Sequence, residues 1–177
     1  MPGNGTASYN IDISGSPDNC SCCGGSNIGI GGICPPGYHC PRGATTPVAC
    51  DAGTYSMDQG AAICSPCVPG FYCPNKTINY QDNSCPTGHY CPENTREPRQ
   101  FPCPQGTYNP ALNGRNESAC LSCLPGKACT VNGLDAPDSN CSAGFYCTGG
   151  STTSKPVNSN EGSKCPSGFY CPEGNQS

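Results

Sequence analysis

The chain has 177 residues, of which 24 are glycine and 20 are proline, while leucine, isoleucine, valine and phenylalanine together number 19 and tryptophan is missing. Burial of so few large apolar side chains cannot offset the roughly 1–2 kcal/mol per residue that ordering a backbone costs, which excludes an ordinary globular core. The formal net charge of −4, with eight lysines and arginines, gives no basic patch for nucleic acid or anionic lipid.

Nineteen cysteines indicate that covalent cross-links replace the missing core. We therefore predict a small disulfide-rich fold: elongated tandem cysteine-rich repeats with short β-hairpins and turns, little or no helix, and a minimal hydrophobic core. Disulfides persist in oxidising compartments, so we expect a secreted or extracellular protein, in a surface appendage or matrix. The sequence contains no run of about 18 apolar residues, so we predict no membrane span in it. Residues 1–6 lack the features of a signal peptide, which suggests a mature form or a fragment.

Residues 1–33 differ in pattern from the rest of the chain. Tyr9, Ile11 and Ile13 alternate with other residues at the period of a half-buried strand. This segment is an edge strand packed on its own chain, a frayed terminus, or a strand lent to a neighbouring subunit or extracellular protein by β-augmentation. A cluster of three cysteines follows, at positions 20, 22 and 23, and we expect two of Cys20, Cys22 and Cys23 to form disulfides.

From Cys34 onward the chain repeats a short unit with a period of about 18 residues, which is typical of a repeat array. The units open at Cys34, Cys50, Cys67, Cys85, Cys103, Cys123, Cys141 and Cys165. Glycine stands three residues after every opening cysteine, often beside proline, and this predicts a turn in which glycine takes a positive φ. The next two residues are usually aromatic, and we expect each ring to lie over a neighbouring disulfide or proline. One unit has Lys127 and Ala128 instead, which predicts a looser joint there.

The cysteines divide the array into three blocks, 34–66, 67–122 and 123–177, the last of them incomplete. The sets are Cys34, Cys40, Cys50 and Cys64; then Cys67, Cys73, Cys85, Cys91, Cys103 and Cys120; then Cys123, Cys129, Cys141, Cys147, Cys165 and Cys171. Units opening at Cys50 and Cys103 lack the early second cysteine, and their partners come late. Four cysteines allow three connectivities and six allow fifteen, so the pairing stays open beyond an expectation that it is local within each block.

The pattern Cys-x-x-Gly-Thr-Tyr, followed by Cys-x-x-Cys-x-Pro-Gly-Phe-Tyr-Cys, resembles the ephrin-receptor-like cysteine-rich repeat and, more distantly, tumour-necrosis-factor-receptor modules. The resemblance covers about 34–177. It implies a spacer of the kind found in surface receptors, matrix proteins and protist surface or ciliary-hair proteins.

Other uses of the cysteines are less favoured by the sequence. The pairs Cys64-x-x-Cys67 and Cys120-x-x-Cys123 superficially match zinc knuckles, but they are far apart in the sequence. The chain has only two histidines, His39 and His89, that could add nitrogen ligands. No βαβ pattern surrounds either pair, as a redox Cys-x-x-Cys would require. Both histidines occupy aromatic positions of the repeat, where packing on a turn is expected. We find no motif for an enzyme and expect no metal or cofactor.

Asparagine-linked glycans are the modification that the sequence supports best. Six Asn-x-Ser/Thr sequons occur, and the two in loops between cysteines, Asn75 and Asn116, are the preferred sites. The others are Asn4, Asn19, Asn140 and Asn175. Asn19 and Asn140 directly precede cysteines, so folding would compete with their modification. Bulky sugars would shield a thin rod that has little core.

Together these features predict a glycosylated extracellular rod, acting as a spacer or as a subunit of an extracellular filament. Partners would then be other copies of the chain or neighbouring extracellular proteins, bound through the N-terminal strand. The alternative is a ligand-binding fragment of a cell-surface receptor ectodomain, which needs an exposed aromatic and arginine patch. The residues nominated for such a patch are Tyr80, Arg96, Arg99 and Phe101.

Overall fold

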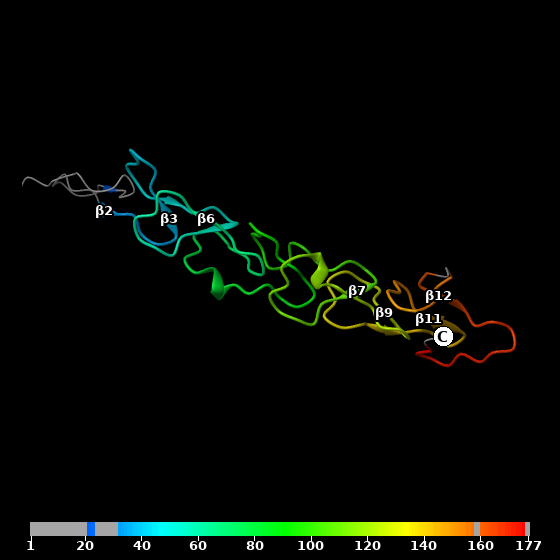
Figure 1. The fold of residues 1–177 in the computed structure, drawn as a ribbon. Coiled ribbons are helices and arrows are strands. Elements are labelled where there is room, and N and C mark those ends of the chain that lie inside the picture. Colours follow the sequence, from blue (N-terminus) through cyan, green and yellow to red (C-terminus); the bar gives the residue numbers. More distant parts are fainter. Residues whose placement is uncertain (1–20, 24–31, 158–159, 176–177) are drawn as a thin grey trace, which may run out of the picture.

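The computed structural model describes residues 21–23, 32–157 and 160–175, which form a long, narrow array (Figure 1). The chain progresses along the array from one end to the other. Most of the buried side chains in these ranges are cysteines, whereas the large apolar residues Ile63 and Val157 are 78% and 81% exposed. The predicted fold class is confirmed, because the interior consists of disulfides rather than of packed aliphatic side chains.

Secondary structure in the described part consists of two- and three-residue strands and two single turns of 3-10 helix. The strands are β1 (Ser21–Cys23), β2 (Gly32–Ile33), β3 (Tyr38–His39), β4 (Val48–Ala49), β5 (Thr54–Tyr55), β6 (Ser65–Pro66), β7 (Thr107–Tyr108), β8 (Leu121–Ser122), β9 (Lys127–Ala128), β10 (Ser139–Asn140), β11 (Phe145–Cys147) and β12 (Gly162–Lys164). The helical turns are η1 (Tyr80–Asp82) and η2 (Glu117–Ala119). These strands pair antiparallel two by two, β1 with β2, β3 with β4 and so on to β11 with β12, which gives separate two-stranded units and no continuous sheet in the described part.

Consecutive units are joined by four backbone hydrogen bonds, which we call the joint. Between the units opening at Cys67 and Cys85, the Gly70 N–H donates to the Cys91 carbonyl at 2.7 Å, and the Cys85 N–H donates to the Gly70 carbonyl at 3.0 Å. The Asn94 N–H donates to the Cys67 carbonyl at 3.1 Å, and the Cys73 N–H donates to the Thr95 carbonyl at 2.9 Å. All four bonds use main-chain groups, so the joint does not depend on particular side chains.

The same four bonds recur at all seven joints between the eight units, with lengths of 2.7 to 3.2 Å. They cross the boundaries at 66/67 and 122/123 without a change of pattern. The chain has few residues in regular strands or helices, so many of its backbone N–H and C=O groups lack a partner within their own unit. The joint bonds pair these groups between neighbouring units, as buried polar groups require. The array is therefore quasi-one-dimensional, with each unit held by the units before and after it.

The turn prediction is confirmed, since the glycine three residues after each opening cysteine has a φ between 75° and 95°. A second left-handed position follows nine or ten residues after the opener. In three units a non-glycine residue fills it: Lys76, Asn94 and Asn113 have φ values of 63°, 64° and 61°. In each case the N–H of this residue donates the joint bond to the carbonyl of the opening cysteine of the preceding unit. This bond offsets the strain of the left-handed conformation.

The expectation of a looser joint at Lys127 and Ala128 is wrong. At this joint the Gly126 N–H donates to the Cys147 carbonyl at 3.0 Å, and the other three bonds are 2.8 to 2.9 Å long. Ala128 is fully buried and pairs with Ser139 between β9 and β10. The reason is that the joint consists of backbone groups, so losing the aromatic pair removes packing without removing the bonds.

The aromatic residues pack partly on one another. The ring of Tyr80 in η1 contacts those of Phe71 and Tyr55, at centroid distances of 5.1 and 4.9 Å. Tyr90 and Phe101 stack at 5.7 Å. These pairs supply small local apolar clusters along the array, in addition to the disulfides.

Candidate functional site

Sixteen cysteines of the described part form eight disulfides, and each pair lies within one of the three expected sets. Six of them close a loop between the opening cysteine and the sixth residue after it: Cys34–Cys40, Cys67–Cys73, Cys85–Cys91, Cys123–Cys129, Cys141–Cys147 and Cys165–Cys171. The remaining two, Cys50–Cys64 and Cys103–Cys120, span 14 and 17 residues. The late cysteines thus bond to the openers that lack an early partner.

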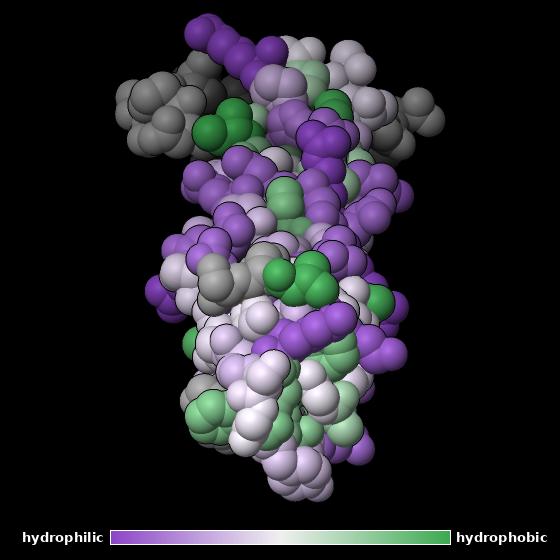
Figure 2. Space-filling view, turned by 90° about the vertical axis from the view of Figure 1, so that its right-hand side faces the viewer, coloured by the Kyte–Doolittle hydropathy of each residue, from purple (hydrophilic) through white to green (hydrophobic). Residues whose placement is uncertain are grey.

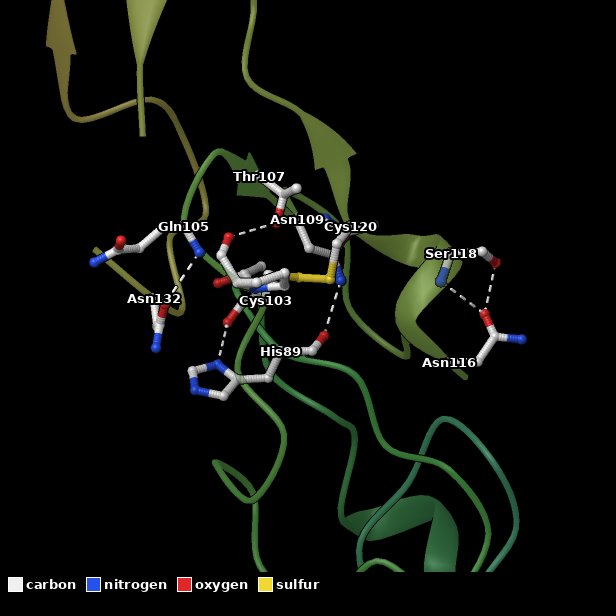
Figure 3. Close-up of a disulfide and its surroundings, with 12 residues drawn as sticks. His89, Cys103, Gln105, Thr107, Asn109, Asn116, Ser118, Cys120 and Asn132 are labelled. Atoms are coloured by element: carbon white, nitrogen blue, oxygen red, sulfur yellow. Dashed lines mark hydrogen bonds between the residues drawn. A yellow bond between two sulfur atoms is a disulfide. The ribbon is translucent and has the colours of Figure 1, made fainter. Parts of the chain in front are cut away.

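The units with a long disulfide replace the missing cysteine with a buried polar residue. Asn109 is 2% exposed, and its amide nitrogen donates to the His89 carbonyl at 2.9 Å while its oxygen accepts from the Ala111 N–H at 3.0 Å (Figure 3). Ser56 is 5% exposed and its hydroxyl donates to the Asp58 carbonyl. Both side chains therefore have hydrogen-bond partners, which makes their burial tolerable.

A histidine lies against one of the long disulfides. The Nδ1 atom of His39, on β3, is 3.3 Å from the Sγ atom of Cys64. Cys50 follows β4, the strand paired with β3, and the ring nitrogen and both sulfurs lie within 4.8 Å of one another. Sequence reasoning missed this cluster, because a separation of 25 residues between His39 and Cys64 carries no motif.

The second histidine has a different environment. His89 Nδ1 contacts the Thr87 carbonyl oxygen at 3.0 Å, and its ring packs against Gly133. Figure 3 shows this ring turned away from the Cys103–Cys120 disulfide. The interpretation of His89 as a ring packed on a turn agrees with this geometry.

Neither Cys-x-x-Cys pair presents two thiolates that could bind zinc. Cys64 is bonded to Cys50 and Cys67 to Cys73, so the first pair belongs to two separate disulfides. Cys120 and Cys123 are likewise bonded to different partners. A zinc ion needs deprotonated sulfurs, which a disulfide does not offer.

One carboxylate has a perturbed pKa. Asp138 accepts hydrogen bonds from the Thr130 N–H at 3.0 Å and from the Thr130 hydroxyl at 2.5 Å. Slight burial raises the pKa of Asp138, but the hydrogen bonds from Thr130 and from its own backbone N–H outweigh this, so the pKa lies below the ordinary carboxyl value of 3.8. This pairing fixes the loop that separates β9 from β10.

The structure differentiates the predicted glycan sites. Asn75 and Asn116 are exposed, and the oxygens of their amides accept from the N–H groups of Ala52 and Ser118. The amide nitrogen of Asn116 points away from the chain in Figure 3. In Asn140, by contrast, the amide nitrogen donates to Glu173 at 2.9 Å and the oxygen accepts from the Lys127 ammonium at 2.6 Å.

The other predicted glycan, disulfide and strand residues are a half-buried asparagine near the C-terminus and positions in the N-terminal segment. Asn175 is half-buried and its carbonyl accepts from the Cys147 N–H, whereas Asn4, Asn19, Cys20 and the strand residues Tyr9, Ile11 and Ile13 lie outside the described residues. Cys22 and Cys23 are described only as part of the backbone of β1.

The residues nominated for a receptor-type patch do not present two exposed rings. Tyr80 and Phe101 are both half-buried and pack on different aromatic neighbours, while Arg96 and Arg99 are exposed. On the face shown in Figure 2, hydrophobic and hydrophilic residues alternate in small groups. An open hollow of about 480 Å³ lies along residues 109–121, with Leu112 and Leu121 among its lining side chains, and none of the four nominated residues lines it. These features give little support to a protein-binding hot spot.

Comparison with known proteins found no match to a family model and no match among curated proteins. Within the described ranges, the chain contains no helix with the length and apolar character needed to cross a bilayer. The disulfides favour an oxidising, extracellular environment.

Proposed function

We propose that this chain is an extracellular structural rod, which acts as a spacer or as a subunit of a filament or surface appendage and carries covalent glycans. The observation that supports this most strongly is the repeated joint. The same four main-chain bonds hold every pair of consecutive units between Cys34 and Cys171. A joint that needs no special side chain sets a constant separation between the two ends of the array, which is what a spacer requires.

The repeat type is consistent with the proposed resemblance to ephrin-receptor-like spacers. Disulfides at every unit make the shape resistant to extracellular conditions, because they restrict the unfolded chain. Exposed sequons at Asn75 and Asn116 would place sugars along the sides of the rod.

Small-angle X-ray scattering of the oxidised protein tests the rod. We expect an extended particle as long as the disulfides are intact. After their reduction, the ratio of the maximum dimension to the radius of gyration should fall. A compact particle under oxidising conditions would contradict the proposal, and so would free thiols in the native protein.

The filament version adds self-association through the alternating segment at residues 9–13. Replacing Ile11 and Ile13 by asparagine should reduce concentration-dependent association in analytical ultracentrifugation. Asp12→Asn, on the opposite face of the expected strand, is the matched control and should leave association unchanged. A monomer at all concentrations would restrict the function to that of a spacer.

A further inference from the structure

The two long disulfides form a natural pair for comparison, and a histidine ring nitrogen lies against the first of them. In each, the opening cysteine is fully buried and the late cysteine, Cys64 or Cys120, is half-buried. Five residues after the opening cysteine of the preceding unit, the chain has His39 in the first case and Tyr90 in the second. In the described part of the chain, Cys50–Cys64 is the only disulfide that clusters with a histidine ring nitrogen.

Only one of the two atoms in this contact can donate a hydrogen bond. A disulfide sulfur carries no hydrogen, so in the 3.3 Å contact with the Cys64 Sγ the Nδ1 of His39 must be the donor. Donation to Cys64 Sγ withdraws electron density from that sulfur and makes it a better target for a thiolate. Because Cys50 is fully buried, an incoming thiol can reach only the Cys64 side of the bond.

We propose that Cys50–Cys64 is a thiol-exchange site, at which a small thiol compound becomes covalently attached to Cys64 with the assistance of His39. The thiolate of the incoming compound attacks the Sγ of Cys64 and forms a new sulfur–sulfur bond. The Cys50–Cys64 bond breaks and its electron pair goes to the Sγ of Cys50. That sulfur lies within 4.8 Å of the His39 ring, from which it takes a proton.

The proton lost by the incoming thiol replaces the one that His39 gives up, so the exchange needs no oxidant or reductant beyond the thiol itself. Its products are a mixed disulfide at Cys64 and a free thiol at Cys50. This site is independent of the structural function proposed above, because the joint bonds around it use main-chain groups.

The experiment exposes the intact, oxidised protein to glutathione for increasing times, blocks free thiols with an alkylating agent, and maps peptides without reduction. We expect the earliest adduct at Cys64, with alkylated Cys50, forming about tenfold faster than any adduct at Cys120, as a hydrogen bond from His39 to the charge that develops on the leaving Cys50 sulfur would give. This comparison is made within the wild-type protein and requires no variant.

His39→Tyr then tests the role of the imidazole. Tyrosine occupies the same place in six other units, as Tyr55, Tyr72, Tyr90, Tyr108, Tyr146 and Tyr170, so the repeat accommodates it. We expect the rate at Cys64 to fall to that at Cys120, while the same peptide maps check that the other seven disulfides between Cys34 and Cys171 are intact. Equal wild-type rates at the two disulfides, an unchanged rate in His39→Tyr, or attachment at Cys50 would each overturn the proposal.

Discussion

The carbonyl oxygen of Asn94 lies directly against the α-carbon of Gly53, which belongs to the unit two steps earlier in the array. A β-carbon added at Gly53 would come within 2.7 Å of this oxygen. The same approach occurs at Gly37 and Gly70, where the opposing oxygens belong to Lys76 and Asn113. Glycine is therefore required for two reasons at these turns: the positive φ, and contact with the second neighbour.

The two reasons can be separated by mutation. At Gly53 an alanine would meet both the left-handed strain and the clash with the Asn94 oxygen, whereas at Gly144 the φ is also positive, at 82°, but no atom lies within 4 Å. We expect Gly144→Ala to cost about 1 kcal/mol of unfolding free energy and Gly53→Ala about 1–3 kcal/mol more. Chemical denaturation of both variants measures the difference, and equal losses would show that contact between second neighbours is unimportant.

The long disulfides should stabilise the array more than the short ones. Replacing Cys103 and Cys120 by alanine opens a loop of 17 residues, and replacing Cys85 and Cys91 opens one of 6. In the chain-entropy model the longer loop restricts the unfolded chain more, by about 1 kcal/mol. Urea denaturation of the two double variants tests this. A larger loss from the short loop would mean that strain or packing in the native state outweighs loop entropy.

The repeat, the glycine turns and the disulfide-based interior could be predicted because each leaves a mark at a fixed spacing. The joint could not, since its bonds join main-chain groups that every residue possesses. Its left-handed donor position is filled by Gly60, Lys76, Asn94 or Gly133 at a spacing of nine or ten, which is too variable to form a motif. The contact between His39 and Cys64 depends on how neighbouring units stack, so no local pattern indicates it.

The loop between β9 and β10 should respond to acid through Asp138. Because the folded pKa of Asp138 is depressed, its contribution is complete above the unfolded pKa and is lost as the pH falls through the lower, folded value. The stabilisation is small, since the carboxylate is largely exposed and screened by solvent. We expect the Thr130 amide resonance to titrate with a midpoint below 3.8 in NMR spectra. Asp138→Asn should abolish this titration, and a midpoint above 3.8 would contradict the assignment.

The final prediction concerns glycan occupancy. Asn75 and Asn116 are exposed, and within the described ranges no group accepts a hydrogen bond from either amide nitrogen, the atom to which the sugar is attached. The amide nitrogen of Asn140 is bonded to Glu173, and the adjacent Cys141 is fully buried in a disulfide. In protein secreted from glycosylating cells, we therefore expect higher occupancy at Asn75 and Asn116 than at Asn140.

Mass spectrometry of glycopeptides measures occupancy at each site. Thr77→Val removes the sequon of Asn75 while nearly preserving the shape of a side chain that is only 7% exposed, so it should abolish that glycan alone. Ser118→Ala should do the same at Asn116. Occupancy at Asn140 equal to that at the two exposed sites would show that modification precedes local folding, because folded-state hydrogen bonds and burial could then have no influence on which asparagines are used.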